Sequence, residues 1–225
     1  AVGVTSFPAI VNTGETLILA NAQGNVISTI SYTDAWYQDN SRKDGGWSIE
    51  QKDPNNPCAG ISNWHASHDL MGGTPGRRNS DYALNPDNAP PQVLRVSVIA
   101  VDTIVLYFNE PIDSTTMLNT TIYSIDNGIG TPTSVKPISP AFNSVRLSLA
   151  SPIVVGTIYT ISVLNGITDC VGNLIGAHNS VRFALPEAAS PNDVVLNEIM
   201  ADPEPQIGLP AAEFVEIYNR SGHPV

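Results

Sequence analysis

"TIVLYFNEPID", residues 103–113, alternates its side chains as a β-strand does. Ile104, Leu106 and Phe108 fall on one face, because successive side chains of a strand point to opposite sides. The same period of two recurs in three later stretches: NSVRLSL (143–149), TIYTISVL (157–164) and SVRFAL (180–185). About seven such strands fit between residues 92 and 185, at spacings typical of a β-sandwich.

The composition agrees with an all-β protein. The 225 residues are enough for one or two domains, and 42% of them are hydrophobic, which suffices for a real core. Glycine (17) and proline (18) are frequent, as expected when many short strands are joined by turns. No long run shows the helical period of 3.6, so we expect almost no helix.

The charge balance excludes some partners. With 10 basic and 21 acidic residues the net charge is −11, which argues against nucleic acid and against anionic lipid surfaces. It remains compatible with Ca²⁺. No apolar stretch approaches the roughly 18–20 residues needed to span a bilayer. Because the chain starts at Ala1 without an initiator Met or a signal peptide, we expect a processed form or a piece of a longer exported protein.

The central region resembles a known family. FNEPID (108–113) and ITDCVGN (167–173), in that order and spacing, resemble motifs of the bacterial Ig-like domains found in surface and S-layer proteins (SbsA-type). The resemblance covers roughly residues 90–186 and implies an Ig-like β-sandwich. We therefore assign this domain to residues 89–186.

The two ends resemble parts of a second family. VVLNEIMADPEP and GLPAAEFVEIYNRS (within 194–221) resemble the start of a bacterial lamin-tail domain, another Ig-like β-fold. Residues 14–32 and 46–79 resemble its second half, with Glu15 where Asp is commoner. We assign residues 1–88 to the C-terminal part of one such domain. Residues 187–225 are a proline-bounded linker and the N-terminal part of the next.

This arrangement predicts how the chain is used. We expect a segment of an alternating array, cut within two of its domains. The alternative is that the incomplete β domains complement each other, within a chain or between chains, because an unpaired strand edge invites pairing. The expected partners are neighbouring domains of the same protein, other cell-surface proteins, or further copies of the chain.

The cysteines and two hydroxyl residues are candidate modification sites. Cys58 and Cys170 form no metal-binding motif, and in an exported protein they could pair; two separate buried thiols are the alternative. Asp102-Thr103-Ile104 and Asp113-Ser114-Thr115 match a short pattern of O-glycosylation in bacteria with similar surface proteins. Ser114, in a predicted loop, is the better candidate, since Thr103 begins a strand.

Ligand sites are less clearly indicated. Asp34, Asp39, Asn40 and Asp44 could offer oxygen ligands to Ca²⁺, although their spacing fits no EF-hand. His65 and His68 lack a third metal ligand at a recognisable spacing. Trp36, Tyr37, Trp47 and Trp64 could stack on a sugar, but we interpret them as packing residues, with Trp47 in a strand GGWSIE. No cofactor is therefore predicted, and Ca²⁺ is the one ion considered.

No catalytic motif is recognisable. The acidic residues near the C-terminus include Glu213 and Glu216, which we do not expect to work as a glycosidase pair, because residues three apart on a strand point to opposite faces. There is no G-x-S-x-G and no phosphate-binding loop. We expect a non-catalytic spacer, display or adhesion segment of an extracellular or cell-surface protein. An accessory region of a secreted hydrolase and a calcium- or glycan-dependent adhesin are the alternatives.

Overall fold

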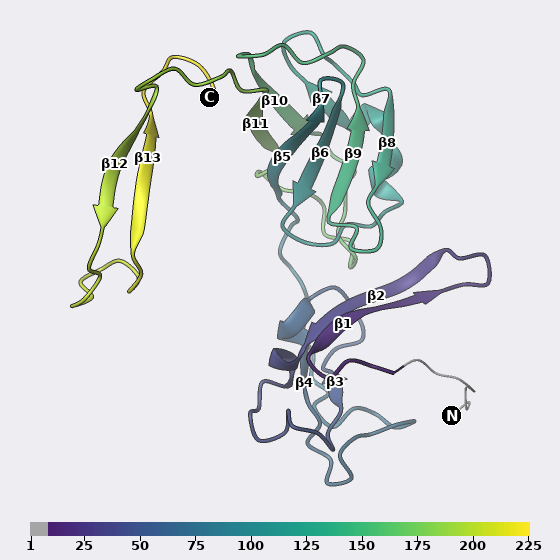
Figure 1. The fold of residues 1–225 in the computed structure, drawn as a ribbon. Coiled ribbons are helices and arrows are strands. Elements are labelled where there is room, and N and C mark those ends of the chain that lie inside the picture. The colour runs from purple at the N-terminus through teal and green to yellow at the C-terminus, as the bar shows by residue number, and fades with distance from the viewer. Residues whose placement is uncertain (1–8) are drawn as a thin grey trace.

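The computed structural model describes residues 9–225, which form β-strands joined by turns and a few short 3₁₀ segments. The all-β prediction is therefore confirmed. Figure 1 shows an N-terminal unit, a central sandwich and a C-terminal hairpin that stands apart from the sandwich. The predicted domain 1–88 includes residues 1–8, which lie outside the described residues.

Seven strands form the central sandwich, as the alternation predicted. They make two antiparallel sheets, one ordered β5-β6-β9-β8 and the other β11-β10-β7. The strands are β5 (Val93–Ala100), β6 (Thr103–Phe108), β7 (Tyr123–Ile125), β8 (Ser134–Pro137), β9 (Ser144–Ser148), β10 (Ile158–Val163) and β11 (Ser180–Ala184).

The core lies between these two sheets. Ile104, Leu106, Val145, Leu147 and Ile161 are all 0% exposed. They come from β6, β9 and β10, the inner strands of their sheets. Facing side chains of two sheets interdigitate in this way because each sheet has one apolar face to remove from water.

The N-terminal unit has two small sheets. A hairpin is formed by β1 (Gly14–Ala20) and β2 (Val26–Thr33), and a second pair by β3 (Ile49–Gln51) and β4 (Trp64–Ala66). The short 3₁₀ segment η1 (Asp34–Tyr37) lies between β2 and β3, and a second one, η2 (Gly60–Asn63), directly precedes β4. The prediction that Trp47 lies in a strand is wrong: β3 begins at Ile49, because the Gly45-Gly46 pair adopts positive φ angles and delays strand pairing.

A buried carboxylate organises this unit. Glu50 of β3 is 4% exposed, and its Oε2 accepts hydrogen bonds from the Ser80 backbone N–H (2.7 Å) and hydroxyl (2.7 Å). Its Oε1 accepts one from the Thr74 hydroxyl at 2.5 Å. Burial alone would raise the pKa of Glu50, but the hydroxyl and amide donors outweigh it and lower the pKa to about 2.

The C-terminal hairpin pairs β12 (Val194–Met200) with β13 (Phe214–Asn219). No other strand of the described chain pairs with either of them. Its link to the sandwich includes a hydrogen bond from the Glu187 N–H to the Pro224 carbonyl.

Residues 9–225 contain no candidate for a membrane-spanning helix. None of the helical segments there has the length and apolarity that a span requires.

Candidate functional site

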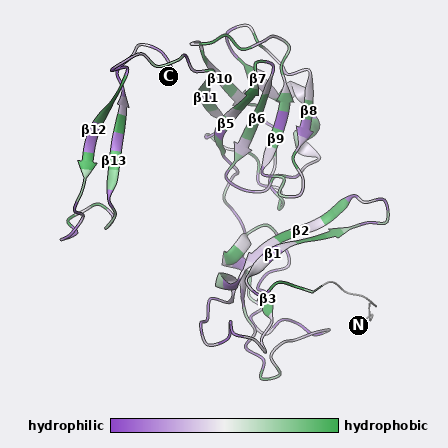
Figure 2. Cartoon of the chain, in the orientation of Figure 1, coloured by the Kyte–Doolittle hydropathy of each residue, from purple (hydrophilic) through white to green (hydrophobic). Residues whose placement is uncertain are grey.

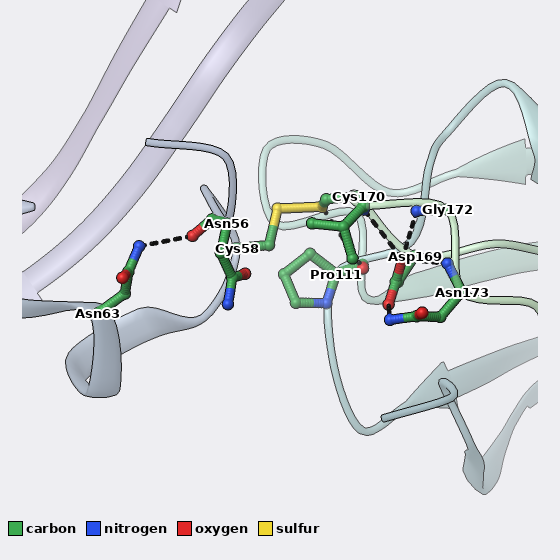
Figure 3. Close-up of a disulfide and its surroundings, with 9 residues drawn as sticks. Asn56, Cys58, Asn63, Pro111, Asp169, Cys170, Gly172 and Asn173 are labelled. Carbon is green, nitrogen blue, oxygen red and sulfur yellow. Dashed lines mark hydrogen bonds between the residues drawn. A yellow bond between two sulfur atoms is a disulfide. The ribbon is translucent and has the colours of Figure 1, made fainter. Parts of the chain in front are cut away.

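A disulfide joins the N-terminal unit to the sandwich. Cys58 lies in the loop between β3 and β4, and Cys170 lies in the turn after β10; their sulfurs are bonded (Figure 3). The two cysteines, whose pairing the sequence left open, are thus placed at one junction between two separately packed parts of the chain. Such a bond is typical of proteins exposed to an oxidising environment.

Both loops that carry the cysteines are held by buried polar groups. On one side, the Asn63 amide, 0% exposed, donates to the carbonyls of Asp53 and Asn56, each at 2.7 Å. On the other, Oδ1 of buried Asp169 accepts hydrogen bonds from three successive backbone N–H groups of the turn, at 2.8–2.9 Å. Each cysteine is therefore presented from an ordered loop.

A second connection lies beside the disulfide. The Asn173 side-chain amide donates to the carbonyls of Asp87 (3.2 Å) and Ala89 (3.3 Å), in the segment that leads from the N-terminal unit into β5. The turn of residues 167–173 thus binds both the loop of Cys58 and the connecting segment. This explains why the sequence ITDCVGN combines Asp, Cys and Asn within a few residues.

Three carboxylates meet at the same place. Single oxygens of Asp87, Glu110 and Asp169 all lie within 4.8 Å of one another. Burial, followed by repulsion from Asp87 and Asp169, raises the pKa of Glu110 to about 7. Because the backbone and Asn173 already occupy the oxygens of Asp169, this cluster is explained as part of the turn.

Asp34, Asp39 and Asn40, three of the residues considered for Ca²⁺, line one surface hollow of about 210 Å³ together with Lys43, whose positive charge opposes a cation. In the described chain, the two groups of three potential ligands that come together include none of Asp34, Asp39 and Asp44. Asp39 instead accepts hydrogen bonds from Ser41 and pairs with Arg42 at 3.2 Å. Those bonds lower the pKa of the Asp39 carboxyl, Ser41 having the largest effect.

Aromatic residues of the N-terminal unit are half-buried rather than displayed. The rings of Trp36 and Trp64 contact each other with centroids 5.8 Å apart, and the Arg42 guanidinium lies 4.6 Å from the Trp47 ring centroid. This agrees with the interpretation that they pack against their own unit.

The predicted glycosylation residues differ in setting. Thr103 is the first residue of β6, and its hydroxyl donates to Asp102 at 3.0 Å. Ser114 lies in a turn between Ile112 and η3 (Thr116–Leu118), where it is partly exposed. Modification of either residue remains a prediction.

His65 and His68 lie next to an acidic residue, Asp81, that could not be recognised from the sequence. His65 and His68 stack with ring centroids 5.0 Å apart, and Asp81 approaches them from the following loop. No spacing rule links an aspartate in an irregular loop to these histidines, so only the structure could find this group.

A comparison with known protein families gives a match in the central domain. Residues 84–184 match a family described as "Bacterial Ig-like domain". The central domain is a bacterial Ig-like domain. Its limits include all seven strands of the sandwich and the segment that Asn173 binds. The SbsA subtype and the lamin-tail assignment of the two ends remain predictions.

Solved structures with similarity include S-layer proteins. The crystal structure of the S-layer protein rSbsC(31–844) is 23% identical, with a TM-score of 0.39, over 49% of this chain and 15% of that one. The N-terminal part of the bacterial S-layer protein SbsC is 25% identical, with a TM-score of 0.37, over 49% and 26%. The match thus spans about a quarter or less of those chains. A search of curated proteins gave no match.

Proposed function

We propose that this chain is a non-catalytic structural segment of a modular, exported bacterial protein, in which it spaces or displays neighbouring domains at the cell surface. The observation that carries the proposal is the Cys58–Cys170 bond, which fastens the Ig-like domain to the unit before it. A rigid connection serves a spacer, whereas an enzyme would need convergent reactive groups in a pocket.

Further features support a structural role. The larger of the two surface hollows described has a volume of about 460 Å³ and lies between β10, β11 and the last residues of the chain. It is lined by Arg182, Ser221 and His223, but the Ser221 hydroxyl donates to the backbone carbonyl of His223 and not to its imidazole, so the pair is not arranged as a nucleophile and its base. The polar groups at the junction bind backbone atoms of their own loops or of the segment that leads into β5, and so stabilise structure.

Location and redox state in the producing cells test this proposal. Intact cells would be treated with a membrane-impermeant amine-reactive label and an impermeant protease, and the cysteines would be blocked before lysis. We expect surface labelling and an oxidised Cys58–Cys170 pair. An intracellular protein with two alkylated thiols would contradict the proposal, and a catalytic domain in the same polypeptide would instead support an accessory region of a secreted hydrolase.

We also propose that both ends are parts of lamin-tail-like domains and that each hairpin is completed by further β-structure. Val194, Leu196 and Ile199 lie opposite Asn219, Ile217 and Val215, respectively. A bulge at Asn197 keeps Leu196 and Ile199 on one face. The five apolar side chains of this face are 38–67% exposed. A two-stranded hairpin with such a face needs a covering partner.

A tandem duplication tests the completion of the hairpins. Two copies in one chain place residues 187–225 directly before residues 1–88 of the next copy. We expect amides of β12 and β13 to gain protection from hydrogen exchange at the internal junction, relative to the same strands at the free C-terminus. Equal exchange at both places would show that the two parts do not complete each other, without affecting the spacer proposal.

A further inference from the structure

We propose that His65, His68 and Asp81 form a binding site for a divalent transition metal of the Zn²⁺ class. One ligand atom from each residue lies within 4.8 Å of the others, so side-chain shifts of about 1 Å would bring them to the roughly 3.3–3.6 Å that separates the ligands of one tetrahedral ion bound at about 2.0–2.2 Å. His65 belongs to β4, His68 follows that strand, and Asp81 comes from the loop that leads to the sandwich.

His65 is already in the tautomer that metal binding requires. Its Nδ1 lies 3.0 Å from the Ala66 carbonyl, which can only accept a hydrogen bond, so the proton resides on Nδ1. Nε2 is then left with a free lone pair. A backbone carbonyl that orients a histidine in this way is a recurrent feature around metal ligands.

Asp81 supplies a carboxylate with unused capacity. Its Oδ2 is buried and finds no hydrogen-bond partner among residues 9–225, which is costly for a charged oxygen. Its Oδ1 lies 3.3 Å from His68 Nε2. A cation between the histidines and this carboxylate removes that cost, which no other group of the described chain offsets.

His68 is the ligand that must change on binding. Arg42 Nη1, which can only donate, lies 3.2 Å from His68 Nδ1, so neutral His68 carries its proton on Nε2, toward Asp81. The metal replaces that proton, Nδ1 becomes protonated, and Arg42 loses this one hydrogen bond. Arg42 keeps its bonds to Asp39 and to the Ser67 carbonyl. Arg42 therefore competes with the metal.

The ligand set indicates the class of metal. Two imidazoles and one carboxylate suit Zn²⁺, Co²⁺, Ni²⁺ or Cu²⁺ better than Ca²⁺ or Mg²⁺, which prefer all-oxygen sites. Three protein ligands leave a coordination position for water. The bound ion would fasten the loop of residues 79–88 to β4 and so stabilise the segment that enters the sandwich.

The test uses the full chain with its disulfide intact. ZnCl₂ would be titrated by calorimetry at neutral pH, and CoCl₂ by visible absorption, which reports the coordination number. We expect one ion per chain, and added protection from hydrogen exchange in residues 79–88. His65→Ala, His68→Ala and Asp81→Asn should each abolish saturable binding, while His178→Ala, an exposed histidine of the sandwich, should bind as the parent does.

Arg42→Gln gives a second and opposite readout. Since it removes a competing donor and a positive charge next to His68, this variant should bind Zn²⁺ more tightly than the parent. Tryptophan fluorescence would verify that every variant is folded. Absence of saturable binding to the parent chain, or equal affinity in the Asp81→Asn and parent chains, overturns the proposal.

Discussion

The central sandwich and the two hairpins are made of similar alternating strands, yet only the sandwich buries its apolar residues. Leu147 of β9 is 0% exposed, whereas Leu196 of β12 is 67% exposed. Figure 2 shows hydrophobic residues on β1, β2, β12 and β13 as well as in the sandwich. The hairpins therefore do not lack hydrophobic side chains.

The difference lies in the presence of a second sheet. In the sandwich, the sheet of β5, β6, β8 and β9 covers the sheet of β7, β10 and β11, so that both apolar faces leave water. The β12–β13 hairpin has no such partner among residues 9–225. Alternation in the sequence thus specifies a face to be buried, and topology decides whether it is buried.

The largest effect is expected from a matched pair of leucine truncations. Leu147→Ala should lower the free energy of unfolding of the sandwich by about 2–5 kcal/mol, because it leaves a cavity in a close-packed core. Leu196→Ala should change it by less than about 0.5 kcal/mol, because its side chain already contacts water. Urea unfolding followed by circular dichroism measures both. Equal losses would mean that the hairpin is covered in solution.

Removal of the disulfide should have the next largest effect. Cys58→Ala with Cys170→Ala should destabilise the protein by about 2–4 kcal/mol, since the bond restricts the unfolded chain across a separation of 112 residues. Calorimetry measures this loss. Hydrogen exchange should increase mostly in the N-terminal unit, whose sheets are small. A loss confined to the sandwich would contradict this distribution.

Glu50→Gln should lower the free energy of unfolding of the N-terminal unit by about 1–3 kcal/mol, because an amide nitrogen would replace one of the two acceptor oxygens. The pKa of Glu50 is lowered from 4.5 to about 2, so its stabilisation is complete above pH about 4.5 and is lost as the pH falls toward 2. All three tryptophans lie in this unit, so their fluorescence reports it selectively. An unchanged acid transition in the variant would refute the assignment.

The smallest effect is expected at Glu110. Its pKa is raised from 4.5 to about 7, so the ionised carboxylate opposes folding above pH 7 and this penalty disappears as the pH falls from 7 to 4.5. Because the group is partly exposed, Glu110→Gln should stabilise the sandwich at pH 8 by less than about 1 kcal/mol. Thermal melts of both chains at pH 8 and at pH 4.5 measure this, and we expect no difference between them at pH 4.5.

The sandwich could be predicted from the sequence because its signal is local. Residues 157–164 and 180–185 alternate without interruption, and the faces predicted for Tyr159, Ile161 and Val163 are the buried ones. The turns also contain the residues that their geometry requires, such as Asn127 and Gly128, both at positive φ.

The junction and the histidine site could not be predicted in this way, because they depend on long-range contacts between loops. Nothing in the sequence near Cys58 indicates that its loop faces the turn of Cys170, and nothing near His68 indicates Asp81. The strand expected at Trp47 failed for a related reason: a paired glycine turn decides where β3 begins. Local patterns predict strands, whereas loop positions follow from the packed whole.

The Cys58–Cys170 bond also determines how the chain would respond to tension applied at its two ends. Force would pass from Cys58 through the sulfurs to Cys170 and bypass the residues between them, which include β5 to β10. With a sequence separation of 112, about 370–400 Å of extended chain would be withheld from stretching. Of the seven sandwich strands, only β11 lies beyond this shortcut. Under oxidising conditions the strands from β5 to β10 would then be protected from extension by force, and a reductant would make them extensible.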